Sequence, residues 1–179
     1  MTRVWLVRHG EPSVAIGRDP GLTELGHRQA EALVDALGPA PVVTSPLRRA
    51  RETALPLEHA WGAVASVEPL VRELPSPTDE PAARREWLLR ALRRTFADLG
   101  DEQRAWRDGV ISCVRAFRED TVVTTHAVVI NAVVGAAVGD DRVLHCRPAH
   151  ASVTVLDIAD SGALTLVELG HEKTESFLA

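Results

Sequence analysis

The chain has 179 residues, of which 45% are hydrophobic and 25% are charged, a balance that excludes the disordered and fibrous classes. Its net charge of −5 is not that of a basic nucleic-acid-binding domain, so we expect no nucleic-acid partner. The length favours one domain, which we predict to span residues 1–179 and to bury its core without disulfides.

No stretch of the sequence has the pattern of a membrane anchor or of a signal peptide. The apolar run at residues 4–7 is too short for export, and the apolar stretch at residues 127–138, which Asn131 interrupts, is too short to cross a bilayer. Cys113 and Cys146 lie far apart in the sequence and are expected to be free thiols. We therefore expect a cytoplasmic protein with no membrane partner.

The first predicted strand leads directly into polar residues. Residues 4–7 form a short apolar run with β-branched side chains, which is typical of a strand buried on both faces. Arg8-His9-Gly10 follow, and Gly10 allows the backbone to bend and to pass close to a ligand. A neutral imidazole is a nucleophile and a guanidinium suits a phosphate, so this strand end is a candidate anion site. A tripeptide recurs by chance, however, so the rest of the chain must decide whether this strand end is an anion site.

A helix is predicted next. Thr23 is a suitable N-cap, Glu24 favours the positive end of the helix dipole, and Gly38-Pro39 marks the end of the helix. The expected core face of this helix consists of Leu25, Ala32, Leu33, Ala36 and Leu37.

A second alternation of strand and helix follows. Residues 41–44 predict a buried strand, after which Ser45 is expected to cap a helix that has Pro46 at its first position. The core face of that helix is expected to contain Leu47, Ala50, Ala54 and Leu57. Residues 63–67 predict a third short strand.

The middle of the chain predicts a helical cap insertion at about residues 75–118. A Pro-rich loop at residues 75–81 precedes two predicted helices, at residues 82–99 and 101–117. The first helix carries arginines that could attract an anionic substrate or could simply form a solvated face; they are Arg84, Arg85, Arg90, Arg93 and Arg94.

The last third of the chain completes an α/β pattern. Residues 121–125 predict a strand that ends at His126, and a helix of small residues follows at residues 127–138. Residues 152–158 and 163–169 predict a final strand pair. Because strands and helices alternate, we predict an α/β fold, a three-layer sandwich with a mostly parallel central sheet and a small helical cap.

Charged and nucleophilic side chains collect at the ends of these predicted strands. The carboxyl ends of parallel strands share one edge of a sheet, so His9, His126 and at least two arginines can converge there. The helices that begin after Ser45 and His126 add backbone N–H donors and positive dipole ends. Together these features predict an anion site that contains a nucleophile.

Four blocks, in order along the chain, resemble the histidine phosphatase superfamily, also called the phosphoglycerate mutase-like family. The first is Leu6-Val7-Arg8-His9-Gly10-Glu11, and the second is Leu22-Thr23-Glu24-Leu25-Gly26 with Gln29-Ala30. The third has Ser45, Leu47, Arg49, Ala50 and Thr53 in the spacing of the family, and the fourth is Val122-Val123-Thr124-Thr125-His126. One block is moderately specific, whereas four in order are a strong indication.

The resemblance implies a role for each of these residues. His9 is expected to be the catalytic nucleophile and to become phosphohistidine, while Arg8, Arg49 and His126 hold the phosphoryl oxygens. The family pattern selects Arg49, which helical periodicity alone does not separate from Arg48 or Arg51. Phosphoryl transfer needs mainly alignment and charge stabilisation, which the arginines provide, so we expect no metal and no cofactor.

A leaving alkoxide needs a proton, and in the family the acid lies after the third strand. Glu73 occupies that place here, with Glu11 as the alternative and an ordinary loop carboxylate as the non-functional interpretation of Glu73. Besides Glu11, the residues expected to bind substrate are Gly10, Ala127 and His150. The chain departs from the family pattern at residues 74–77, at Ala127, where a Gly is usual, and near His150, where an Asn often stands.

We predict a metal-independent phosphatase that hydrolyses a small phosphorylated molecule through phosphohistidine. Two enzymatic alternatives are a phosphoglycerate mutase-type phosphotransferase and a phosphohistidine protein phosphatase, and a third is a non-catalytic phospho-ligand binding module. Mutases of the family are longer, so the short stretch at residues 74–101 disfavours the first. The intact set of His9, Arg8, Arg49 and His126 disfavours a binding module, because binding alone needs no nucleophile.

Overall fold

The computed structural model describes residues 1–14 and 19–173. The fold is mixed α/β, with a six-stranded sheet in the order β3-β2-β4-β1-β5-β6. The strands are β1 (Thr2–Arg8), β2 (Val42–Thr44), β3 (Ser66–Val67), β4 (Thr121–Thr125), β5 (Val153–Ile158) and β6 (Leu164–Glu168). Strands β1 to β4 pair in parallel, while β5 and β6 pair antiparallel. The predicted mostly parallel sheet with a final strand pair is confirmed.

Strand β1 lies inside the sheet, between parallel β4 and antiparallel β5. Side chains alternate across a strand, so Val4 and Leu6 enter the larger core while Val7 enters a second core on the opposite face. All three side chains have no exposed area. This burial on both faces confirms the interpretation of the first apolar run.

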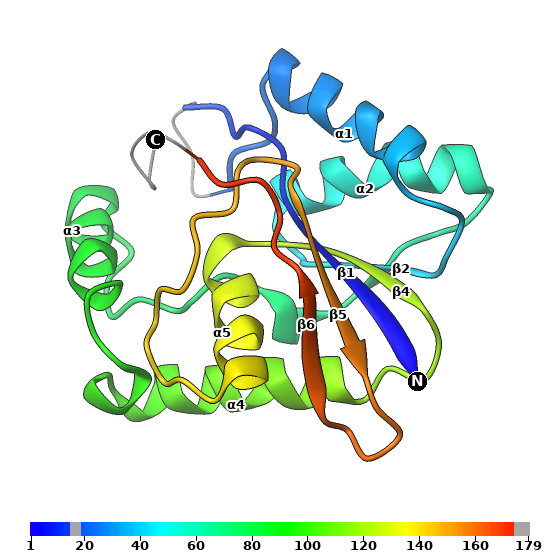
Figure 1. The fold of residues 1–179 in the computed structure, drawn as a ribbon. Coiled ribbons are helices and arrows are strands. Elements are labelled where there is room, and N and C mark those ends of the chain that lie inside the picture. Colours follow the sequence, from blue (N-terminus) through cyan, green and yellow to red (C-terminus); the bar gives the residue numbers. More distant parts are fainter. Residues whose placement is uncertain (15–18, 174–179) are drawn as a thin grey trace.

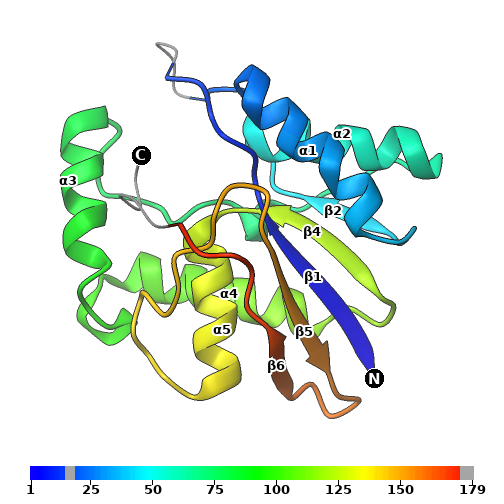
Figure 2. The ribbon, with the colours of Figure 1, turned by 45° about the horizontal axis from the view of Figure 1, so that its top comes forward.

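Helices cover both faces of the sheet. Helices α1 (Glu24–Ala36) and α2 (Arg48–Trp61) pack on one face, and α4 (Asp101–Arg115) and α5 (Ala127–Val138) pack on the other (Figures 1 and 2). Helix α3 (Pro81–Ala91) stands beside this sandwich, away from the sheet, in both views. The three predicted layers are therefore present. The carboxyl ends of the parallel strands β1 to β4 share one edge of the sheet.

The predicted helical insertion is divided between two environments. Helix α3 buries only Ala91, whereas Val110 and Val114 of α4 belong to the larger core. The helix predicted for residues 82–99 ends at Ala91, because a 3₁₀ turn at Phe96–Asp98 follows and inserts the buried Phe96 ring into the core. Among the described helices, α3 is thus the one that projects beside the sandwich, although its Trp87 and Leu88 are partly buried against the larger core.

Two further details differ from the predictions. Ala30 and Leu33 form the buried side of α1 together with Gly26, while Leu25 is 43% exposed, because Gly26 packs against the chain after β1. Helix α2 begins at Arg48, and its N-cap is Leu47, not Ser45. The hydroxyl of Ser45 has other partners, which belong to the candidate site.

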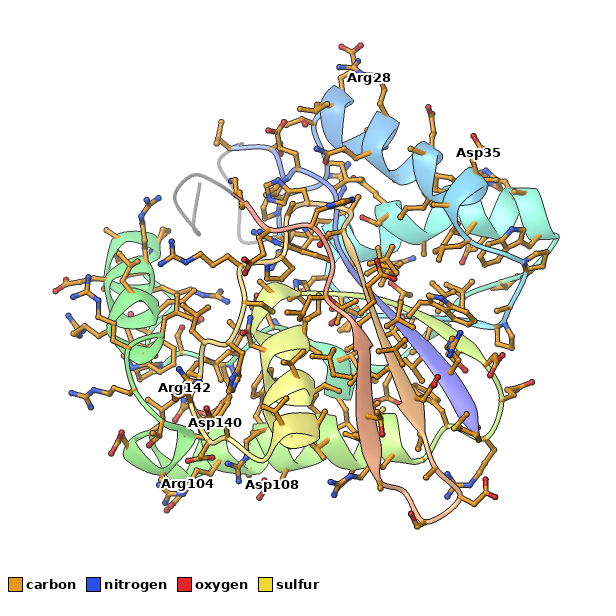
Figure 3. All side chains as sticks on the ribbon, in the orientation of Figure 1. Arg28, Asp35, Arg104, Asp108, Asp140 and Arg142 are labelled. Carbon is orange, nitrogen blue, oxygen red and sulfur yellow. The ribbon has the colours of Figure 1, made fainter. Side chains whose placement is uncertain are left out.

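Charged side chains mark the outer surface of the layers. Figure 3 shows Arg28 and Asp35 pointing outward from α1, and Arg104 and Asp108 lying on the outer side of α4. Cys113 and Cys146 are free thiols, as predicted. Within the described residues, no helix combines the length and the apolar character needed to cross a membrane.

Candidate active site

The backbone at the end of β1 is held by both neighbouring strands. The N–H of His9 donates to the carbonyl of Thr125 at 2.9 Å, and the N–H of Arg8 donates to the carbonyl of Ser152 at 3.1 Å. Beyond His9 the chain passes tightly over α1, since a Cβ added at Gly10 would lie 2.6 Å from the carbonyl oxygen of Gly26. Only glycine fits this approach. The contact fixes the backbone of residues 9–11, which we call the nucleophile loop because His9 is the predicted nucleophile.

The imidazole of His9 is oriented by contacts at both ring nitrogens. Nδ1 lies 2.7 Å from the carbonyl oxygen of Gly10, which can only accept, so Nδ1 carries the hydrogen. Nε2 then has a lone pair, and it accepts a hydrogen bond from Nε of Arg49 at 3.2 Å. Both contacts favour the tautomer in which Nε2 is the nucleophilic atom.

Arg49 reaches His9 from the first turn of α2, and Thr53 one turn later ties this helix to the nucleophile loop. The hydroxyl of Thr53 donates to the carbonyl of Arg49 at 2.7 Å and accepts from the N–H of Gly10 at 2.9 Å. The guanidinium of Arg49 also lies 4.0 Å from the carboxylate of Asp19. The structure therefore brings Arg49, and not Arg48, to His9, because Arg48 pairs with Glu52 at 2.6 Å.

His126 approaches the nucleophile from the end of β4. Its ring centroid lies 5.3 Å from that of His9, and its Nε2 lies 2.7 Å from Oγ of Ser45. Nδ1 of His126 is buried and has no hydrogen-bond partner among the described residues. Helix α5 begins at Ala127, so the positive end of its dipole and its first backbone N–H groups face this edge of the sheet.

Burial and positive charge keep both imidazoles neutral. Burial lowers the pKa of His9 well below its usual range, and the charge of Arg49 adds to this effect. Burial and Arg49 lower the pKa of His126 in the same way. Burial also lowers the pKa of Arg8, to about 10, but this guanidinium stays protonated at neutral pH. The site therefore combines a neutral nucleophile with fixed positive charge, as attack on a phosphate requires.

Glu73 lies on a loop that is fastened to the sheet and to α4. The hydroxyl of Thr125 donates to the carbonyl of Val71 at 2.8 Å, and the indole N–H of Trp106 donates to the carbonyl of Arg72 at 2.9 Å. Burial raises the pKa of Glu73, while the N–H of Leu74 and the charges of Arg49 and Arg8 oppose this rise. Glu73 is thus a half-buried carboxyl near Arg8 and Arg49, and its pKa lies above the usual value for a glutamate.

The alternative acid, Glu11, faces α1. Its carboxylate accepts from the hydroxyl of Thr23 at 2.6 Å, and its N–H donates to the side chain of Gln29 at 2.8 Å. These contacts fasten the N-cap of α1 to the nucleophile loop, and they give Glu11 a structural role. Glu73 is therefore the better candidate for the acid.

The other predicted substrate-binding residues lie at the same edge. The N–H of Gly10 is already donated to Thr53, so Gly10 positions the loop. Ala127 begins α5 next to His126. The ring of His150 lies 5.8 Å from that of His9, so the structure places a third imidazole in the site.

Sequence reasoning assigned no role in the site to three supporting residues. Ser45 orients His126, and Thr53 joins Arg49 to Gly10. The buried amide of Asn131 donates to the carbonyl of Cys146 at 3.0 Å, which fastens the loop before β5 to α5. For Thr53 the sequence does hold a signal: it lies four positions after Arg49, and residues with this spacing share a helix face. The partners of Ser45 and Asn131 are too distant in sequence to be read from it.

A metal site has no support in the described part of the chain, where no three His, Cys, Asp or Glu side chains group as metal ligands do. The positive charge near His9 comes instead from Arg8 and Arg49, and the guanidinium of Arg8 also donates to the carbonyl of Pro148 at 2.7 Å. Planar guanidinium groups match phosphate oxygens in geometry and charge.

Known proteins resemble this chain in sequence and in fold. Glucosyl-3-phosphoglycerate phosphatase of Mycobacterium tuberculosis is 34% identical over 122 residues, which cover 57% of this chain and 53% of that protein. The chain thus spans about half the length of this curated relative. A phosphoglycerate mutase structure from Thermus thermophilus covers 94% of this chain and 98% of its own, with 26% identity and a TM-score of 0.64.

A mycobacterial glucosyl-3-phosphoglycerate phosphatase structure has the same fold, with a TM-score of 0.68 and 23% identity over 94% of this chain and 99% of its own. The family description that matches residues 4–170 is that of branch 1 of the histidine phosphatase superfamily. The matched range includes all the candidate site residues, from Arg8 to His150. The chain therefore belongs to the histidine phosphatase superfamily.

Proposed function

We propose that this protein is a metal-independent phosphatase that hydrolyses a small phosphate monoester through a phosphohistidine intermediate on His9. One observation carries the proposal: Nδ1 of His9 donates to Gly10, while Nε2 faces the guanidinium of Arg49 at 3.2 Å. A nucleophilic lone pair and a cation suited to phosphate thus lie against each other, so a phosphate held by this guanidinium would lie beside Nε2. Membership of the superfamily and the phosphatase names among its relatives support the same activity.

The reaction has two steps. Nε2 of His9 bonds to phosphorus while the bond from phosphorus to the ester oxygen breaks, and that oxygen takes a proton from Glu73. Water then attacks phosphorus and gives a proton to the Glu73 carboxylate. The nitrogen–phosphorus bond breaks, its electron pair returns to Nε2, and inorganic phosphate leaves. Arg8, Arg49 and His126 hold the phosphoryl oxygens through both steps.

A phosphotransferase of the mutase type differs in the second step, where a second substrate replaces water. Among the described helices, α3 alone projects beside the sandwich, and Ala91 is its one fully buried residue. Such a short cap favours entry of water over retention of a phosphorylated intermediate. A phosphohistidine protein phosphatase would use the same residues on a protein substrate, and a binding module would use them without turnover.

The test uses para-nitrophenyl phosphate with and without a metal chelator. Wild-type protein is expected to release nitrophenolate at the same rate in both conditions, and His9→Ala is expected to lower kcat by more than about 10³-fold. Because α1 and β4 hold the backbone of this loop, His9→Ala is expected to keep its circular dichroism spectrum. Activity that the chelator removes, or a folded His9→Ala protein with full activity, contradicts the proposal.

A further inference from the structure

His150 lies against the nucleophile, although it is far from it in sequence. Its ring centroid is 5.8 Å from that of His9 with an angle of 32° between the planes, a separation close to the 5.3 Å between His9 and His126. His9 therefore has two imidazole neighbours. The chemistry assigned to the site so far uses only His126.

The turn that carries His150 is fastened to the nucleophile loop. The N–H of Ala151 donates to the carbonyl of Arg8 at 2.9 Å, and the N–H of Ser152 closes the turn on the carbonyl of Ala149 at 3.1 Å. The guanidinium of Arg8 holds the carbonyl of Pro148 at 2.7 Å. The backbone on both sides of His150 is thus tied to the residue that precedes the nucleophile.

This turn also contains an unfavourable backbone conformation. Ala151 has a φ of 55°, and among the described residues it is the only non-glycine with a positive φ. A residue with a Cβ keeps such a conformation only when its surroundings impose it, and such positions cluster at functional sites. The contacts of Ala151 with Arg8 supply that constraint, and their effect is to hold the neighbouring His150 beside His9.

The imidazole of His150 has an unused polar atom. Its Nε2 is buried and has no hydrogen-bond partner among the described residues, although the side chain as a whole is only half-buried. Burial lowers the pKa of His150 to about 3, and the charge of Arg8 adds to the effect, so the ring is neutral. A buried polar atom without a partner is costly, and a neutral imidazole can offer an N–H to an anion.

We propose that His150 is a substrate-binding residue of this site and that its Nε2 hydrogen-bonds an oxygen of the phosphoryl group that His9 attacks. The inference rests on the proposed function and adds a second imidazole, after that of His126, to the groups that hold the phosphate. The contact is made in the ground state and in the transition state alike, so its loss raises KM and leaves kcat nearly unchanged.

The test compares the kinetics of three variants on para-nitrophenyl phosphate. His150→Ala is expected to raise KM by about tenfold or more, as the loss of a hydrogen bond to a charged group predicts, with little change in kcat. His150→Gln is expected to recover most of the loss, because its amide nitrogen reaches the position of Nε2. His59→Ala, on the exposed side of α2, serves as the matched control and is expected to match wild type.

A KM of His150→Ala within about twofold of wild type overturns the inference, as does a His150→Gln protein that is no better than His150→Ala. Stabilisation by inorganic phosphate separates this outcome from failure of the proposed function. If the wild-type protein hydrolyses no ester, phosphate is still expected to raise its Tm and that of His150→Gln, and to raise the Tm of His150→Ala by a smaller amount at the same phosphate concentration. Equal shifts in all three proteins overturn the role of His150.

Discussion

Arg49 donates its Nε hydrogen to Nε2 of His9 over 3.2 Å, across 40 positions of sequence. The guanidinium thus occupies the lone pair that attacks phosphorus in the proposed mechanism. A phosphate oxygen would compete for the same guanidinium and, because it is charged, would form the stronger bond. In the proposed mechanism, substrate binding therefore releases Nε2 of His9 and places phosphorus beside it.

The phosphorylated protein should show the chemistry of a nitrogen–phosphorus bond. Nε2 of His9 is the ring nitrogen that carries no hydrogen, so we expect the label from a phosphorylated substrate to be on this nitrogen, to be lost in acid and to be retained in base. Rapid quenching of a single turnover, followed by acid or alkali treatment, measures this. A label that survives acid points to a serine or threonine ester instead.

Glu73→Gln should separate substrates by their leaving groups. An alkoxide needs a proton from Glu73 on departure, whereas nitrophenolate leaves without one, so we expect a loss of about 10²–10⁴-fold for alkyl phosphates and a much smaller loss for aryl phosphates. The ratio of kcat/KM for the two classes measures the effect. An equal loss for both classes excludes Glu73 as the acid and makes Glu11 the next residue to substitute.

The same substitution should stabilise the fold at neutral pH. Because burial raises the folded-state pKa of Glu73, the native protein binds this proton more tightly than the unfolded chain does. Stability from this group is present at pH below 4.5, the ordinary pKa of a glutamate, and is lost as the pH rises through the folded-state pKa.

Glu73→Gln imitates the protonated form at every pH. We expect its Tm to exceed that of wild type at pH 7.5, by about 2–4 °C for each kcal/mol gained, and to match wild type near pH 4. Thermal unfolding at the two pH values measures the difference. A gap that is the same at both pH values would show that the effect does not come from ionisation.

Two adjacent arginines of α3 should differ in their effect on substrate affinity. Arg84 is half-buried and lies close enough to lower the pKa of Glu73 and of His126, whereas Arg85 is exposed. We expect Arg84→Gln to raise KM roughly fivefold at low ionic strength and less at high salt, because its charge is screened. Arg85→Gln is the control on the same helix, and we expect its KM to match that of wild type. If both substitutions raised KM equally, attraction of the anionic substrate would belong to the whole helix face and not to Arg84.

Local pattern predicted His9 and His126 as candidate reactive residues because each directly follows a strand. His9 and His126 end buried strands, and parallel pairing of those strands brings them to one edge whatever the loops do. Arg49 needed the resemblance to the family, since three arginines share the start of α2. The helix-capping rule was wrong at Ser45, whose hydroxyl contacts His126, 81 positions away in sequence.

Tertiary packing decided the features that the sequence left open. The rotation of α1 depends on the contact between Gly10 and Gly26, so Leu25 is exposed despite its apolar character. The environment of Glu73 depends on bonds from Thr125 and Trp106, which no spacing reveals. His150 faces His9 only because a strained turn at Ala151 holds it there.

The bonds that join Arg8 and His9 to the strands on either side have a consequence for motion. An amide hydrogen inside a sheet exchanges with solvent only when the sheet itself opens, so the amide of His9 shares the lifetime of the native state. Helix α3 has one fully buried residue, Ala91, so its opening is expected to cost less free energy. We therefore expect amide hydrogen exchange to be slow at His9 and faster in α3, so the two parts of the molecule differ in how often their backbones open.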